Sequence, residues 1–196
     1  MLHKHTRPFI ALAAGLLLAG AAQAQNLPGP FFGIGGGVSS YDMDCSGTSR
    51  CDSSGAALRV SGGWRSAINL GFEAVYTNFG QASATVFSPG YGNVDVALKS
   101  YMLGAGAVYF LPLGQNVELA FRLGAAHVEA KPNGRIGSTS VDLGSEKRLS
   151  AYVGFGAGFK IAPNLLAEIN VDSTRFEAAG DEANVSAVTV GLRWRF

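Results

Sequence analysis

The feature that most restricts the fold is an alternation of apolar residues with small or polar residues. In residues 188–196, Val, Val, Leu, Trp and Phe occupy one parity, whereas Thr, Gly, Arg and Arg occupy the other. Because successive side chains of a β-strand point to opposite faces of a sheet, this period predicts strands with one apolar face. The alternation recurs in eight segments, at residues 32–39, 57–65, 68–77, 101–111, 117–126, 149–161, 165–172 and 188–196.

The connections between these segments alternate in length. Long polar connections are expected at residues 41–54, 78–93, 131–145 and 178–183, and short ones at 65–67, 112–115 and 162–164. Long connections at one end and short turns at the other are typical of antiparallel hairpins that cross a bilayer. The pattern therefore predicts an all-β fold, a transmembrane eight-stranded antiparallel up-and-down β-barrel, with both termini on the periplasmic side.

The second face of the predicted strands is rich in Gly and small residues, with single charges between them. The chain contains 27 Gly and only 15% charged residues, whereas the wet face of a soluble sheet would carry many Lys, Glu, Thr and Gln. Eight strands enclose only enough space for side chains, and a closed barrel leaves no unpaired edge in lipid. We therefore expect a narrow lumen in which Gly leaves room for a few long side chains.

The charges of this second face have both signs on neighbouring segments. Because buried charges need partners, we expect them to form a plug of salt bridges and not an open pore. Two further arginines, Arg65 and Arg195, lie near segment ends and are open to the alternative of a solvated rim position. The predicted lumen charge network consists of Arg59, Glu73, Glu118, Arg122, Lys160, Glu168, Asp172 and Arg193.

The N-terminus has the pattern of an export signal. Lys4 and Arg7 precede an apolar run over residues 9–22, which is shorter than the ~18 residues of a spanning helix. The small-x-small pattern that ends at Ala24 predicts cleavage after this residue; the alternative is a short N-terminal anchor helix. The expected organisation is a signal peptide over 1–24, a short periplasmic segment over 25–29 and an outer-membrane barrel over 30–196.

The two cysteines, Cys45 and Cys51, lie close together in a polar connection. In an oxidising compartment, such a pair is expected to form a disulfide. Two thiolates without a nearby His make a poor zinc site. The segment that begins at Asp42 and Asp44 resembles half of a calcium loop, but Ser53 occupies the position of the bidentate Glu. We therefore expect neither a metal nor a cofactor.

The Gly-rich first segment, residues 31–38, and the aromatic closing segment, residues 188–196, resemble those of small eight-stranded outer-membrane proteins. These are the OmpA-like barrel domain and its OmpX and opacity-type relatives, and the resemblance covers residues 30–196. It implies insertion into the outer membrane of a Gram-negative bacterium. It also implies that Trp194 and Phe196 belong to a C-terminal signal read by the barrel-assembly machinery. Outer-membrane lipids and lipopolysaccharide are further expected partners.

The leading functional hypothesis is a non-enzymatic, monomeric surface barrel. Its long loops would serve membrane integrity, adhesion or interaction with a host or environmental ligand, since recognition commonly lies on loops. Lys131, Arg135, Lys147 and Arg148 are candidates to contact lipopolysaccharide phosphates, with plain solvated loop residues as the alternative. The net charge of +1 gives no reason to expect a nucleic-acid partner.

Two other functions stay open at this point. A small channel is the first, although paired lumen charges argue against it. A lipid A-modifying enzyme is the second, because His127 is the only His after residue 24 and lies at the predicted outer end of a strand. The His-x-Ser pattern of lipid A deacylases is absent, since Val128 and Glu129 follow His127. We therefore expect no catalytic residues.

Overall fold

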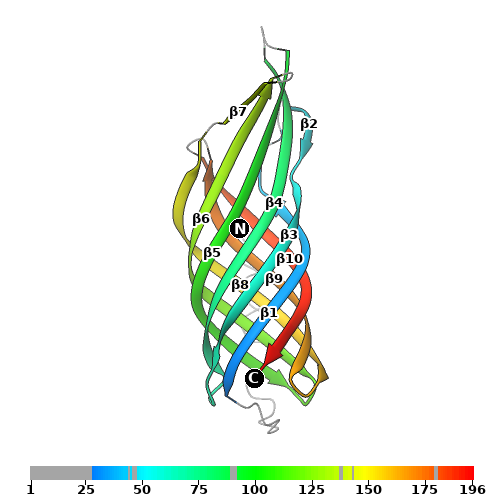
Figure 1. The fold of residues 1–196 in the computed structure, drawn as a ribbon, viewed down its shortest axis with the longest axis vertical. Coiled ribbons are helices and arrows are strands. Elements are labelled where there is room, and N and C mark those ends of the chain that lie inside the picture. Colours follow the sequence, from blue (N-terminus) through cyan, green and yellow to red (C-terminus); the bar gives the residue numbers. More distant parts are fainter. Residues whose placement is uncertain are drawn as a thin grey trace, which may run out of the picture.

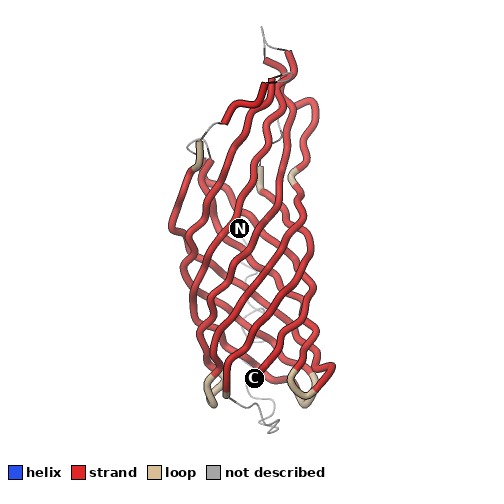
Figure 2. Tube along the Cα trace, viewed as in Figure 1, coloured by secondary structure: helices blue, strands red, loops and turns tan. Residues whose placement is uncertain are grey.

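A computed structural model describes residues 28–43, 45, 48–88, 92–136, 139–142, 144–178 and 181–196. Figure 1 shows strands inclined to the long axis of a tall barrel, and Figure 2 shows the loops and turns that join them. The strands are β1 (Gly29–Tyr41), β2 (Thr48–Asp52), β3 (Ser54–Arg65), β4 (Leu70–Ser88), β5 (Gly92–Leu113), β6 (Val117–Ile136), β7 (Thr139–Asp142), β8 (Glu146–Ala162), β9 (Leu165–Ala178) and β10 (Asp181–Arg195). Within this described part of the chain, no helix is long and apolar enough to cross a membrane.

Eight of these strands close into the predicted antiparallel barrel. The order is β1-β3-β4-β5-β6-β8-β9-β10, and β1 pairs with both β3 and β10. Phe31 faces Arg195 and Tyr41 faces Val185 across the closing pair. The backbone N–H of Phe196 donates to the carbonyl of Pro30 at 3.0 Å, so the first and last strands meet at the end of the short turns. The fold class expected from the alternation is confirmed.

Burial follows the parity that the alternation predicts. The outward positions carry large apolar side chains with high exposure, such as Phe72 at 65%, Leu123 at 65% and Val190 at 60%. The inward positions of the same strands are buried, as at Glu73, Arg122 and Thr189. Apolar side chains that face outward and charges that face inward reverse the usual arrangement of a soluble protein, and a lipid environment accounts for the reversal.

Glycine provides the inward space that the long side chains occupy. A Cβ added at Gly156 would lie 2.6 Å from Asn170 Oδ1 and 2.8 Å from Arg122 Nη1. A Cβ at Gly154 would lie 2.6 Å from Asp172 Oδ1 and 3.0 Å from the Tyr152 hydroxyl. These glycines therefore have a steric cause. The side chain of Arg122 fills the volume that a side chain at Gly154 or Gly156 on β8 would occupy.

The long connections differ from the prediction because much of their length is strand. Residues 78–93 were expected to form a loop, but β4 continues to Ser88 and β5 begins at Gly92. A bulge between Asn78 and Gln81 interrupts the register, and Gly80 there has φ +73°. At the opposite end, the segment predicted from residue 68 begins only at Leu70, because Asn69 adopts a left-handed turn conformation with φ 65°.

These extensions form a second structural unit, here called the projecting sheet. It consists of β2, residues 81–88 of β4, residues 92–99 of β5, residues 131–136 of β6, and β7, in that spatial order. Figure 1 shows it rising beyond the other strands at the end opposite the short turns. It is continuous with one side of the barrel wall, so the barrel holds it in a fixed orientation.

Candidate functional site

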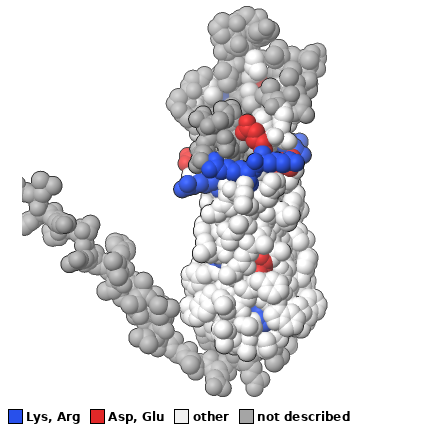
Figure 3. Space-filling model, turned by 90° about the vertical axis from the view of Figure 1, so that its left-hand side faces the viewer, with Lys and Arg blue, Asp and Glu red and all other residues white. Residues whose placement is uncertain are grey.

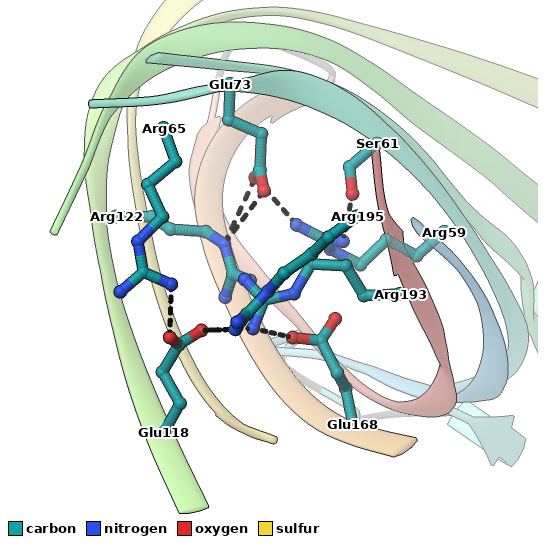
Figure 4. A network of polar contacts seen from close by, with 9 residues as sticks. All are labelled: Arg59, Ser61, Arg65, Glu73, Glu118, Arg122, Glu168, Arg193 and Arg195. Carbon is teal, nitrogen blue, oxygen red and sulfur yellow. Dashed lines mark hydrogen bonds and ion pairs between the residues drawn. The ribbon is translucent and has the colours of Figure 1, made fainter. Parts of the chain in front are cut away.

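Charged side chains in the lumen form two clusters, and Figure 4 shows most of their members. The inner cluster lies toward the middle of the barrel and contains Arg59, Glu73, Arg122, Asp172 and the hydroxyl of Tyr152. The end cluster lies near the short turns and contains Arg65, Glu118, Glu168, Arg193 and Arg195.

The inner cluster is centred on the guanidinium of Arg59. Its Nη2 donates to Glu73 Oε1 at 2.7 Å and its Nε donates to Asp172 Oδ2 at 2.8 Å. Tyr152 donates its hydroxyl proton to the other oxygen of Asp172 at 2.8 Å. The Nε of Arg122 lies 3.1 Å from Glu73 Oε1. Four strands, β3, β4, β6 and β9, are thereby joined across the lumen by alternating charges.

The end cluster is centred on Glu118. Its Oε1 lies 2.7 Å from Arg193 Nη2 and 2.6 Å from Arg195 Nη2, and its other oxygen accepts from Arg65. Arg193 also lies 2.8 Å from Glu168 Oε1. One carboxylate therefore contacts three guanidinium groups, which come from β3 and β10.

Two aromatic rings pack beneath these arginines. The guanidinium carbons of Arg65 and Arg193 lie 4.7 and 4.8 Å from the ring centroid of Phe110. Phe31 meets Phe110 edge to face, with centroids 5.5 Å apart. Such cation–π contacts are stronger when water is excluded, so the rings support the charged cluster and fill the lumen beside it.

An apolar cap fills the lumen beyond the inner cluster. On β5 and β6 it begins where the charges end, because Met102 and Val128 lie farther from the short turns than Val108 and Arg122 do. Tyr41 packs edge to face on Phe176 at 5.8 Å, and its hydroxyl lies 2.9 Å from Ser100 Oγ. The cap consists of Tyr41, Ala57, Val75, Phe79, Ala82, Leu98, Met102, Ala126, Val128, Ala130, Tyr152, Phe176, Val185 and Ala187.

The structure places seven of the eight predicted network residues in the lumen, and the exception is Lys160. That side chain is exposed at the short-turn end of β8, where a register shift between Lys160 and Ala162 breaks the strict alternation. The assignment of Lys160 to the lumen is therefore corrected. Arg65 is buried, with 3% of its surface exposed, so the solvated-rim alternative is wrong for it; Arg195 keeps 22% of its side chain exposed.

Sequence reasoning missed Tyr152, Phe31 and Phe110 as members of the lumen clusters. All three lie on the inward parity of their strands, so parity was the available signal. That signal was not used, because the predicted network was restricted to charged residues. Of the terminal aromatics, Trp194 is half-buried and Phe196 is exposed at 76%. The predicted cleavage at Ala24 and the segment 1–24 lie outside the described residues.

The disulfide expected between Cys45 and Cys51 is present, with the two Cα atoms 5.9 Å apart. Cys51 lies on β2 opposite Ala84 of β4, so the bond ties the preceding loop to an outer strand of the projecting sheet. Next to it, Asp52 Oδ1 accepts from the backbone N–H of Ser54 at 3.1 Å and from its hydroxyl at 2.7 Å. These hydrogen bonds lower the pKa of Asp52. Asp44, which the resemblance to a calcium loop includes, lies outside the described residues.

Comparison with known proteins agrees with this architecture. The model of the family described as "Outer membrane protein beta-barrel domain" matches residues 9–196. The attachment invasion locus protein Ail of Yersinia pestis has a similar fold, with TM-score 0.58 and 20% identity over 87% of this chain and 100% of that one. Neisserial surface protein A follows at TM-score 0.56 and 18% identity, covering 85% and 97% of the two chains. A major outer membrane protein of Thermus thermophilus matches at TM-score 0.51 and 14% identity, covering 85% and 99%. No curated protein sequence matches the chain.

Proposed function

This chain belongs to the outer membrane β-barrel family, and from that premise we propose that it is a non-enzymatic surface barrel that mediates adhesion through its projecting sheet. The observation that carries the proposal is the continuity of this sheet with a closed, filled barrel. A rigid scaffold that holds an exposed polar surface away from the bilayer suits recognition of another surface. A role in the integrity of the outer membrane is compatible with the same arrangement.

The exposed surface of the projecting sheet has the chemistry of a recognition site. Gln81, Ser83 and Asp95 are exposed on it, and the hydroxyl of Thr85 donates to Asp95 Oδ1 at 2.7 Å across the two strands. Arg50 is exposed on β2 beside them. Neutral polar groups with a few charges of both signs form hydrogen bonds with glycans or proteins equally well.

The filled lumen argues against the alternative of a small channel. Arg59, Glu73 and Asp172 close the middle of the barrel, and each is exposed at 4% or less. Moving ions through this position requires breaking buried ion pairs, which costs several kcal/mol for each uncompensated charge. The apolar cap adds a second obstacle, since an ion would lose its hydration there.

The surroundings of His127 argue against a lipid A-modifying enzyme. Its side chain is exposed on the outward face of β6, and its cross-strand neighbours are Leu103 on β5 and Leu149 on β8. A catalytic His needs a nucleophile and an orienting acid within hydrogen-bond reach. Leu103 and Leu149 supply neither a nucleophile nor an acid. Leucine neighbours are instead expected for a residue at the lipid interface.

Adhesion can be tested by shortening the β4–β5 hairpin. Residues 85–95 are replaced by Asn-Gly, a two-residue turn that reconnects the paired positions Ala84 and Val96. A matched control replaces residues 85–95 with a Gly/Ser segment of equal length. Each variant is displayed on a non-adherent Gram-negative strain, folding is verified by heat-modifiable gel migration, and bound bacteria are counted on an epithelial monolayer.

We expect the intact protein to raise adhesion several-fold over cells that lack it, and both variants to lose this gain. Loss in the length-matched control would assign the effect to the surface of the sheet and not to its height. Unchanged adhesion in the shortened variant, or no gain with the intact protein, would contradict the proposal.

A further inference from the structure

Exposed lysine and arginine side chains gather on one side of the barrel, at the base of the projecting sheet. Lys99 lies on β5, Lys131 on β6, Lys147 on β8 and Arg175 on β9, and all four side chains are exposed. Figure 3 shows lysine and arginine side chains as a belt, with a few acidic side chains beside it, above a broad surface that is nearly free of charge. These four residues are called the basic rim.

The basic rim lies where the lipid-facing surface ends. Leu149, the next outward residue below Lys147, is exposed at 73%, and Leu103 on β5 is exposed at 61%. Such exposure of leucine is compatible with contact to acyl chains and not with contact to water. Charged groups directly above it therefore lie at the level of lipid headgroups, where cationic side chains are attracted to anionic lipid.

The described cations of this level lie in one sector of the barrel circumference. On the other four strands, the outward positions just above the apolar belt carry no cation: Ser186 on β10, Ser40 on β1, Ala56 on β3 and Asn78 on β4. A general need for solubility at the membrane surface would distribute charge around the whole barrel. Concentration on β5, β6, β8 and β9 instead indicates a localised anionic ligand.

A buried carboxylate orders the centre of the rim. Glu129 is exposed at only 8%, and its oxygens lie 3.2 Å from Lys131 Nζ and 3.8 Å from Lys147 Nζ. Lys131 Nζ also lies 5.2 Å from the centroid of the Tyr101 ring. The single charge of Glu129 is shared by two lysines, so Lys131 and Lys147 are positioned but not fully neutralised.

We propose that the basic rim binds the phosphate groups of lipid A, so that lipopolysaccharide associates with the β5–β9 side of the barrel. The charge is complementary, the rim is at headgroup level, and the leucines below it accept the acyl chains of the same molecule. Of the four residues first considered for such contact, Lys131 and Lys147 belong to the rim. Arg148 is half-buried on the inward parity, and the side chain of Arg135 lies outside the described part. The proposal rests on the outer-leaflet location that the proposed function assumes.

The test compares two pairs of substitutions that remove the same charge. Lys131→Gln/Lys147→Gln alters the rim, and Arg50→Gln/Lys160→Gln alters two exposed cations away from it. The refolded full chain in detergent micelles is titrated with bisphosphorylated lipid A, with its dephosphorylated form and with inorganic phosphate as competitor. Native mass spectrometry reports occupancy, and heat-modifiable migration verifies folding.

We expect the unaltered protein to prefer the bisphosphorylated lipid about tenfold, since each cation near an anionic headgroup contributes about fivefold and Glu129 offsets part of this. The rim variant should lose most of this preference and the control pair should keep it. Equal binding of the two lipids, equal loss in both variants, no loss in the rim variant, or displacement by millimolar inorganic phosphate would overturn the proposal. Because adhesion is tested on the β4–β5 hairpin, the two proposals can fail separately.

Discussion

The barrel lumen and the projecting sheet are built from the same strands, yet they bury side chains differently. Along most of the lumen, parity decides burial, so that Arg122 is buried while Leu123, its neighbour in sequence, is exposed at 65%. In the projecting sheet this difference fades beyond Ala82 and Leu98: Ala84 and Thr85 are both half-buried, and so are Val96 and Ala97 on the neighbouring strand. The two faces of a strand differ only where one meets lipid and the other a packed interior. The lumen is therefore expected to supply stability, and the sheet to supply surface.

Among the substitutions that test this difference between lumen and projecting sheet, Glu118→Ala is expected to have the largest effect on stability. The substitution leaves Arg65, Arg193 and Arg195 without their shared carboxylate, and a buried charge that loses its partner costs about 3–5 kcal/mol. The free energy of unfolding in detergent is measured by urea titration with tryptophan fluorescence. As a control, Asp95→Asn on the projecting sheet should change it by less than about 0.5 kcal/mol. Equal losses in the two variants would show that the two regions do not differ in stability.

A smaller loss is expected from Gly156→Ala. The added Cβ would crowd Asn170 Oδ1 and Arg122 Nη1, and overpacking of this kind costs about 1–3 kcal/mol. The matched control is Gly36→Ala on the outward face, whose Cβ would meet only the Ala57 carbonyl at 3.8 Å. If the two variants unfold at the same urea concentration, steric demand inside the lumen does not explain its glycines.

Replacing Cys45 and Cys51 with Ser should leave the barrel almost unchanged. The disulfide ties a loop to β2, which opens as a local unit, so the global free energy of unfolding is expected to shift by less than about 0.5 kcal/mol. Limited proteolysis should nevertheless cleave residues 41–54 faster than in the unaltered protein. A clear drop in barrel stability would mean that the projecting sheet and the lumen unfold together.

The smallest expected effect concerns the titration of Asp52. Hydrogen bonds from Ser54 lower the pKa of this carboxyl, so their contribution is present above the pKa of the unfolded chain and is lost as pH falls through the lowered value. In Ser54→Ala, the pKa of Asp52 should rise toward its usual value, as carboxyl carbon NMR would report. An unchanged pKa would show that the backbone N–H of Ser54 suffices.

The alternation predicts the barrel well because each barrel strand has one face in lipid. It fails above the bulge at Asn78–Gln81, where residues 81–86 still alternate but their small and neutral side chains are also typical of a polar connection. Lys160 keeps the inward parity but is exposed, because it lies at the short-turn end of β8, and parity alone does not show where the lumen opens to water. The partners of each charge were also beyond prediction, because pairing across the lumen depends on strand register and not on sequence distance.

The outer strands of the projecting sheet have a consequence for crowded cell surfaces. Within the bilayer, closure leaves no strand unpaired, but the sheet opens once it leaves the barrel and is bordered by β2 and β7. These strands are only five and four residues long. Short border strands offer too few backbone groups for a neighbouring molecule to continue the sheet. Many copies can therefore stand side by side at high density without polymerising through their exposed strands.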